Sequence, residues 1–201
     1  MMAKSKLQNS PKVLGLDVST ATIGWALFDI QTKQLLELTH ISPRPKLETD
    51  DKVEELIRKS DVFKTKLLEY TNMGITKVVI EEPLLHSNNI YTVQTLMRYN
   101  SFITKVIYDT LNIIPEFIST YDSRKFAFPN LVKENDKGKF VLFGGFPKDV
   151  DKKQIIWENV AQLEPQITWQ YTKKQTLKKE NFDMTDSYTC VLGYMKSKKI
   201  W

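Results

Sequence analysis

The chain has 201 residues, of which 41% are hydrophobic and 26% charged, so it is neither disordered nor fibrous and can bury the core of one domain. One Cys cannot form an intramolecular disulfide, and one Cys with two His cannot supply the four ligands of a structural zinc site. A catalytic metal would therefore rely on carboxylates, which suit Mg²⁺ or Mn²⁺. The opening residues are polar and no apolar run reaches about 18 residues, so we expect a cytoplasmic protein with no signal peptide and no membrane span.

Basic residues are concentrated toward the end of the sequence. The net charge is +5, and residues 152–201 hold nine Lys against five acidic residues. A basic surface of this kind suits a polyanion such as nucleic acid. A solvated basic face explains the same counts, so charge alone does not separate the two interpretations.

Apolar runs and turn residues predict a sheet combined with several helices. Strand patterns occur at residues 13–17, 23–30, 34–41, 77–81 and 113–119. Helix patterns, with apolar residues at every third or fourth position, occur at residues 53–70, 88–111, 151–163 and from residue 182 onward. Residues 127–147 contain Gly and Pro around an apolar run, and we interpret them as an insertion that forms a β-hairpin.

The order of these elements predicts the fold class. Strands joined by tight hairpins are antiparallel, whereas strands joined through helices are parallel by right-handed crossover. The sequence therefore predicts an α/β protein with a mixed five-stranded sheet, in which three antiparallel strands are followed by two parallel ones, and helices on both faces. We expect residues 1–11 to be a flexible tail and residues 12–201 to be a single domain.

Two carboxylates end strands that we expect to be parallel neighbours. Asp17 ends the first strand and Glu81 the fourth, where a charge is costly unless it is paired. Each alone is explained as a capping or hydrogen-bonded residue, but sites in α/β sheets gather at the carboxyl ends of strands, and two carboxylates there repel without a cation. Glu82 is an alternative to Glu81; neighbours on a strand point to opposite faces, so only one of them can face Asp17.

The last helix adds two more acids, Asp183 and Asp186, which are three residues apart and therefore share one face. Cys190 and Gly193 continue this line, and such small residues would let this edge of the helix approach the sheet. Both acids also lie in the first turns, where stabilisation of the helix dipole is the simpler explanation. Against it, four carboxylates from three elements are what a site needs to hold two Mg²⁺ ions for phosphodiester hydrolysis.

Arg124 and Lys125 follow the fifth predicted strand. They are candidates for holding a phosphate of a nucleic acid, and ordinary surface charges are the alternative.

Four segments together resemble the RuvC-type nucleases. Residues 14–29 (LGLDVSTATIGWALFD) resemble the first motif of that family, residues 79–83 (VIEEP) the second, and residues 182–187 (FDMTDS) the terminal D-x-x-D motif. Residues 151–155 (DKKQI) resemble the lysine-bearing start of the preceding helix. Each motif is weak alone, but they occur in the family's order over roughly residues 12–196.

This resemblance implies an RNase H-like fold and a Mg²⁺-dependent endonuclease, with Mn²⁺ able to substitute. Asp17, Glu81, Asp183 and Asp186 match the four carboxylates that bind two metal ions, and Lys152 or Lys153 matches the basic residue near the scissile phosphate. The implied protein is a Holliday junction resolvase, of the small kind found in bacteriophages. It would act as a homodimer that nicks four-way DNA junctions symmetrically and leaves 5′-phosphate and 3′-hydroxyl ends.

Three other functions are compatible with parts of this pattern. Actin-like ATPases and sugar kinases share the first motif, but they need a second lobe with its own Gly-rich loop, for which 201 residues with 7 Gly leave no room. A nuclease of the same fold that acts on RNA or RNA–DNA hybrids keeps all four carboxylates. A non-catalytic nucleic-acid-binding module would not need them.

Overall fold

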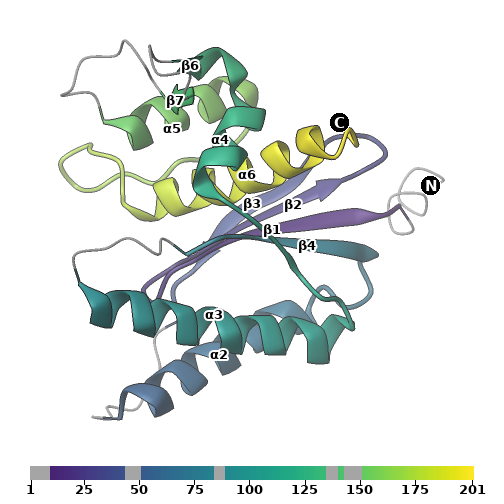
Figure 1. Ribbon diagram of the computed structural model, residues 1–201, viewed down its shortest axis with the longest axis vertical. Coiled ribbons are helices and arrows are strands. Elements are labelled where there is room, and N and C mark those ends of the chain that lie inside the picture. The colour runs from purple at the N-terminus through teal and green to yellow at the C-terminus, as the bar shows by residue number, and fades with distance from the viewer. Residues whose placement is uncertain (1–9, 44–50, 84–88, 135–139, 143–150) are drawn as a thin grey trace.

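The computed structural model describes residues 10–43, 51–83, 89–134, 140–142 and 151–201, so most of the predicted tail at 1–11 lies outside the described residues. A five-stranded sheet lies at the centre (Figure 1). Its strands are β1 (Lys12–Val18), β2 (Ile23–Asp29), β3 (Leu35–Ile41), β4 (Ile75–Glu81) and β5 (Glu116–Ile118).

The pairing of these strands confirms the predicted mixed sheet. The spatial order is β3-β2-β1-β4-β5. β2 pairs with β1 and β3 in antiparallel orientation, whereas β1–β4 and β4–β5 are parallel. The two central parallel strands, β1 and β4, are the ones that carry Asp17 and Glu81.

Helices cover both faces of the sheet, as predicted (Figure 1). One face is covered by α2 (Lys52–Leu68) and α3 (Ile90–Leu111), and the other mainly by α6 (Glu180–Ser197), against which α4 (Thr120–Ala127) and α5 (Lys152–Leu163) pack. α4 and the 3₁₀ turn η1 (Pro129–Leu131) were not predicted. β6 (Val132–Glu134) and β7 (Phe140–Leu142) pair in antiparallel orientation, which agrees with a hairpin in the segment interpreted as an insertion.

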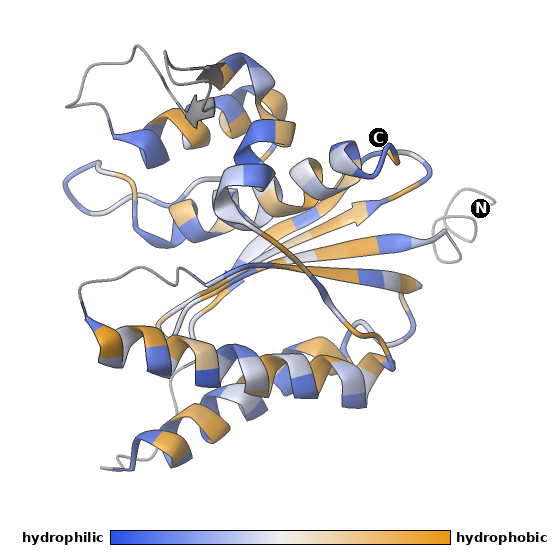
Figure 2. Ribbon diagram, in the orientation of Figure 1, coloured by the Kyte–Doolittle hydropathy of each residue, from blue (hydrophilic) through white to orange (hydrophobic). Residues whose placement is uncertain are grey.

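Alternation along the strands divides the core into two halves. Val13 and Val79 pack in the cluster formed with α5 and α6, whereas Leu14, Leu16 and Ile80 pack in the cluster formed with α2 and α3. Apolar residues accordingly run along the strands in Figure 2. Because successive side chains point to opposite faces, Asp17 and Glu81 share the α6 face with Val13 and Val79.

α6 lies very close to the sheet because two glycines face it. A Cβ on Gly15 would lie 2.7 Å from the Ser187 carbonyl oxygen, and one on Gly24 would lie 2.5 Å from the Asp183 carbonyl carbon. No side chain longer than hydrogen fits at either position without moving the helix. These two contacts place the first turns of α6 directly over β1 and β2.

One expectation about this helix was wrong. Gly193 does not face the sheet; its open side meets the Ser123 backbone of α4. α6 is buried on nearly all sides from Met184 to Met195, because α4 and α5 pack against it in addition to the sheet. Among the described residues, no helix has the length and apolar character needed to cross a membrane.

Candidate active site

The four predicted carboxylates meet where the central strands end beneath the first turns of α6. Leu16 of β1 is in register with Ile80 of β4, so Asp17 and Glu81 follow at the same edge of the sheet. Asp17 also pairs with Gly24 across the β1–β2 ladder, and the backbone of Asp183 lies over Gly24. The topology therefore brings together residues from the beginning, middle and end of the chain.

Asp186 is the most buried member, with only 4% of its surface exposed. Its Oδ1 lies 3.1 Å from Arg124 Nη2, and its Oδ2 lies 3.1 Å from Lys153 Nζ. A buried carboxylate without such partners would be strongly destabilising. Two cations from two different helices, α4 and α5, thus form ion pairs with the buried Asp186 carboxylate.

Glu81 has one satisfied and one unsatisfied oxygen. Thr120 Oγ1, at the start of α4, donates to Oε1 at 2.6 Å. Oε2 is buried and has no hydrogen-bond partner. A buried acceptor left in this state costs on the order of 1–3 kcal/mol, which a cation or a donor at that position would offset.

Burial and the negative charges of neighbours raise the pKa of three carboxylates in the cluster. Burial, followed by the negative charges of Glu81, Asp186 and Asp183, raises the pKa of Asp17 well above its usual value. Burial and the Asp186 charge raise the pKa of Glu81 to about 7, and burial raises that of Asp183 to about 6 although the Thr22 hydroxyl donates to it. Added positive charge would relieve this repulsion.

The two candidate lysines at the start of α5 differ in position. Lys153 contacts Asp186, and the attraction of that carboxylate raises the pKa of the Lys153 ammonium even though burial lowers it. Lys152 is exposed, and it is not among the main causes of the pKa shifts in the cluster. Of the pair, it is Lys153 that reaches the carboxylates.

The two residues expected to hold a phosphate also separate. Arg124 turns inward to Asp186, as described above, with 12% of its side chain exposed. Lys125 Nζ instead lies over the rings of Tyr121 and Phe126, at 6.0 and 5.6 Å from their centroids. The inward position of Arg124 gives it a defined partner that the sequence did not reveal.

The donor set fits a divalent cation in charge and chemistry. Four carboxylates are the hard oxygen ligands that Mg²⁺ prefers, and the orphaned Oε2 of Glu81 is an acceptor that a cation would satisfy. As the side chains lie, however, no three His, Cys, Asp or Glu residues in the described part of the chain are close enough to form a ready metal-binding group. Asp186 forms ion pairs with Arg124 and Lys153 in this arrangement.

Two hydroxyl residues at the cluster were not anticipated from the sequence. Thr22 lies in the turn between β1 and β2, and Thr120 begins α4; they donate to Asp183 and Glu81, respectively. A signal for Thr120 was present in the sequence, because Ser119 and Asp122 form a helix-capping pattern that marks the start of α4. In the structure the Ser119 Oγ accepts from the Asp122 N–H at 3.0 Å.

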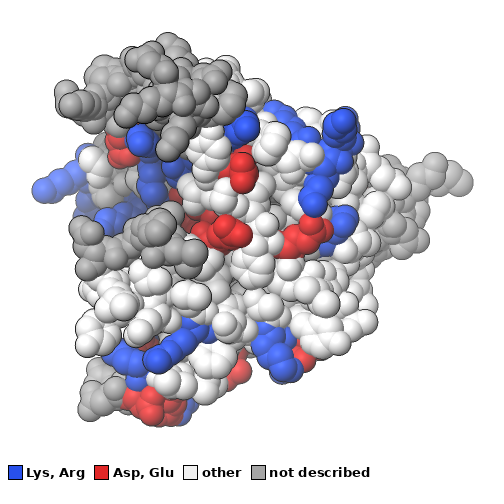
Figure 3. Space-filling view, viewed as in Figure 1, with Lys and Arg blue, Asp and Glu red and all other residues white. Residues whose placement is uncertain are grey.

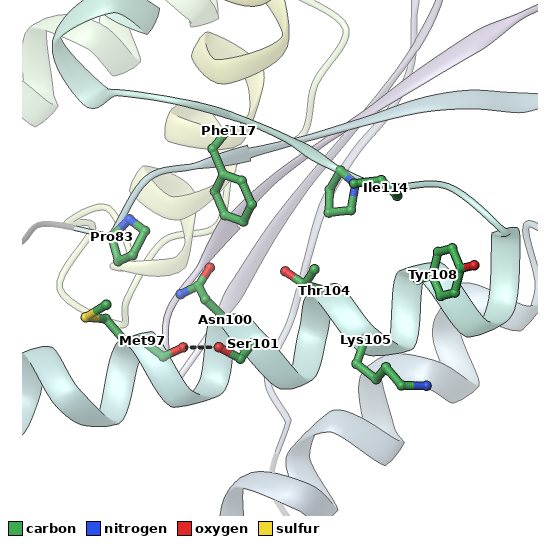
Figure 4. A pocket seen from close by; sticks show the side chains of 10 residues that line it. Pro83, Met97, Asn100, Ser101, Thr104, Lys105, Tyr108, Ile114 and Phe117 are labelled. Carbon is green, nitrogen blue, oxygen red and sulfur yellow. Dashed lines mark hydrogen bonds between the residues drawn. The ribbon is translucent and has the colours of Figure 1, made fainter.

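A cavity lies away from the carboxylate cluster, between α3 and the β5 side of the sheet (Figure 4). Its volume is about 720 Å³, and Met97, Phe117, Ile114 and Tyr108 give it a mostly apolar lining. None of the four carboxylates lines it. Its chemistry suits neither a metal ion nor a phosphate.

Comparison with solved structures defines the fold. The chain superimposes on RuvC of Thermus thermophilus in complex with a Holliday junction substrate with a TM-score of 0.59 at 8% identity, covering 92% of this chain and 95% of that one. A second structure of Thermus thermophilus RuvC gives 0.55 at 12%, covering 93% and 96%. The yeast mitochondrial Holliday junction resolvase gives 0.61 at 11%, covering 98% of this chain and 82% of the other.

The fold is therefore RNase H-like, in the arrangement found in RuvC and the yeast resolvase. At these identities the similarity defines the architecture and not the activity. In sequence, no family model and no curated protein matches the chain.

Proposed function

We propose that the chain is a metal-dependent, structure-selective DNA endonuclease that resolves four-way junctions. The observation that supports this most directly is the meeting of Asp17, Glu81, Asp183 and Asp186, with Lys153 among them, at the edge of an RNase H-like sheet. Burial and the charges of neighbouring carboxylates raise the pKa of Asp17, Glu81 and Asp183, so this site is suited to positive charge.

In this proposal the four carboxylates hold two Mg²⁺ ions, with Mn²⁺ able to substitute. When bound, such a pair of ions would supply activation of the attacking water and stabilisation of the leaving oxygen, and the expected products are 5′-phosphate and 3′-hydroxyl ends. Thr120 and Thr22 orient Glu81 and Asp183 by hydrogen bonding. Lys153, which is half-exposed, faces both Asp186 and the surface from which a scissile phosphate would approach.

The assembly proposed is a homodimer. A four-way junction presents two equivalent strands for cleavage, and two protomers related by a two-fold axis would nick them symmetrically. We further propose residues 12–201 as the nuclease domain with 127–147 as its insertion, a cytoplasmic location, and the compact type of resolvase found in bacteriophages. The phosphate-binding roles of Lys152, Arg124 and Lys125 belong to the same proposal.

The test is a gel assay on a labelled four-way junction, a matched linear duplex and an RNA–DNA hybrid, each with Mg²⁺ or EDTA. Paired Mg²⁺-dependent nicks confined to the junction would support the proposal. Cleavage of the hybrid alone would keep the carboxylate site but transfer the function to RNA processing. Absence of cleavage with Mg²⁺ and with Mn²⁺ would overturn the enzymatic assignment in favour of a binding module.

A further inference from the structure

A short hairpin precedes α6 and is built independently of the central sheet. Tyr171 and Leu177 form an antiparallel bridge, and the Thr172 N–H donates to the Thr176 carbonyl at 2.8 Å. At the tip, Gln175 adopts a left-handed conformation with φ 61°. We refer to residues 170–178 as the 170–178 hairpin.

One buried side chain fixes this hairpin to the active-site helix. Asn181, which is fully buried in the first turn of α6, accepts from the Gln170 N–H at 3.1 Å and donates to the Gln170 carbonyl at 2.6 Å. The two residues that follow Asn181 are Phe182 and Asp183. The hairpin is therefore held in a fixed position relative to the carboxylate cluster.

A cavity of about 430 Å³ lies between this hairpin and α5. Three aromatic residues line it, Trp157 from α5, Tyr171 from the hairpin and Phe182 from α6, together with the amides of Gln154 and Gln175. Two of its lining residues are sequence neighbours of site residues, because Phe182 precedes Asp183 and Gln154 follows Lys153. The cavity is thus positioned by the same two helices that supply site residues.

The hairpin that bounds the cavity carries basic residues. Lys173, Lys174, Lys178 and Lys179 are all exposed on the hairpin or at its end. Figure 3 shows blue side chains at the left edge of the molecule, where Figure 1 has the loop that leads into α6. Such charges suit the sugar–phosphate backbone of a nucleic acid that passes over the cavity toward the carboxylates.

We propose that this cavity holds one unpaired nucleobase of the strand presented to the carboxylates, and that it thereby selects the position of the cut. Aromatic side chains stack on bases, and Gln amides hydrogen-bond base edges. The cavity volume lies near the lower end of the range for small-ligand sites, which suits a single base. The proposal rests on the nucleic-acid function proposed above.

The side chains differ in their availability for such contacts. Gln154 Nε2 already donates to Glu158 Oε1 at 3.0 Å. No residue in the described part of the chain hydrogen-bonds the side-chain amide of Gln175, which is exposed at the hairpin tip. Tyr171 is 46% exposed. Gln175 is therefore the candidate for reading the base edge, and Tyr171 the candidate for stacking.

The test combines binding and cleavage on four-way junctions that carry 2-aminopurine, or an abasic analogue, at successive positions near the branch point. Binding is measured in EDTA from 2-aminopurine fluorescence, and cut positions are mapped with Mg²⁺. Tyr171→Ala and Gln175→Ala are compared with Tyr108→Ala, a matched control whose tyrosine is 47% exposed on α3.

For the wild-type protein we expect fluorescence quenching at one position, and an abasic residue there should lower cutting at the matching site by about five-fold or more, the factor expected for a lost stacking contact. Tyr171→Ala should abolish both effects, Gln175→Ala should reduce the base preference, and Tyr108→Ala should preserve both. Unchanged quenching and cut positions in Tyr171→Ala and Gln175→Ala, with junction cleavage intact, would overturn the pocket and leave the proposed function standing. Position-specific quenching that depends on Tyr171, without any cleavage, would support base binding in the cavity and overturn the proposed nuclease function. Failure to bind any of the junctions would overturn both.

Discussion

Replacement of Gly24 by Ala is the sharpest perturbation of the placement of α6. The added Cβ would lie 2.5 Å from the Asp183 carbonyl carbon, closer still to its oxygen, and 3.2 Å from the Met184 nitrogen. Ordinary contact begins at 3.4 Å, so the first turn of α6 must recede by roughly 0.9 Å or more. Because the obstructing atoms belong to the backbone, no change of rotamer can relieve the contact.

Two consequences of Gly24→Ala can be measured separately. Overpacking of this kind costs about 1–3 kcal/mol, and at this chain length each kcal/mol lowers Tm by about 2–4 °C. Displacement of a catalytic group by about 1 Å can lower the rate of cleavage about 100-fold. We therefore expect a modest fall in Tm and a much larger fall in the rate of Mg²⁺-dependent junction nicking, measured well below Tm.

Leu192→Ala is the matched control for stability. Leu192 is buried on the same helix, and its truncation should cost about 2–5 kcal/mol by leaving a cavity. It leaves the backbone over Gly24 in place, so the folded variant should nick at close to the wild-type rate. If Gly24→Ala lowered Tm but nicked as fast as Leu192→Ala, the argument that this contact positions Asp183 would be refuted.

Three further predictions concern the carboxylates and their partners. Asp17→Asn should abolish Mg²⁺-dependent cleavage while junction binding in a gel-shift assay persists; cleavage at the wild-type rate would exclude Asp17 as a ligand. Lys153→Met should reduce nicking by at least about ten-fold, because it removes a cation from the cluster, whereas Lys152→Met, which removes only a proposed phosphate contact at the surface, should reduce it by a smaller factor; equal effects would contradict the inward position of Lys153. The increase of Tm by Mg²⁺ should grow as pH rises from 5.5 to 8.5, because protons held by Asp183 up to about pH 6 and by Glu81 up to about pH 7 must leave before a metal binds. An equal increase of Tm at both ends of that range would contradict the assignment.

The sheet and most helices were predictable because they depend on local patterns. The apolar runs and their connections determined which strands are parallel, and side-chain alternation separated Glu81, which lies in the cluster, from the exposed Glu82. The fifth strand is shorter than its apolar run, residues 113–119, because Pro115 lacks the N–H that a paired strand needs. Its observed extent is Glu116–Ile118.

The environment of the site was less predictable because it depends on packing between distant elements. α4 has only eight residues, too few for a periodic apolar pattern, so the sequence did not predict it. Because α4 carries Thr120 and Arg124, their contacts with Glu81 and Asp186 were not predicted either. Lys152 and Lys153 are equivalent in sequence, and only the position of α5 against α6 selects Lys153. The covering helix α4 likewise explains why Gly193 does not face the sheet.

The close contact between β1 and α6 also bears on how the protein is synthesised. Asp17 leaves the ribosome before Asp183 and Asp186, which follow roughly ten to thirty seconds later at ordinary elongation rates. Until then one apolar face of the sheet lacks its cover, and an interrupted chain would expose it to aggregation or proteolysis. A nascent chain therefore lacks half of the proposed ligand set, and the helix that completes the hydrophobic core also completes the site.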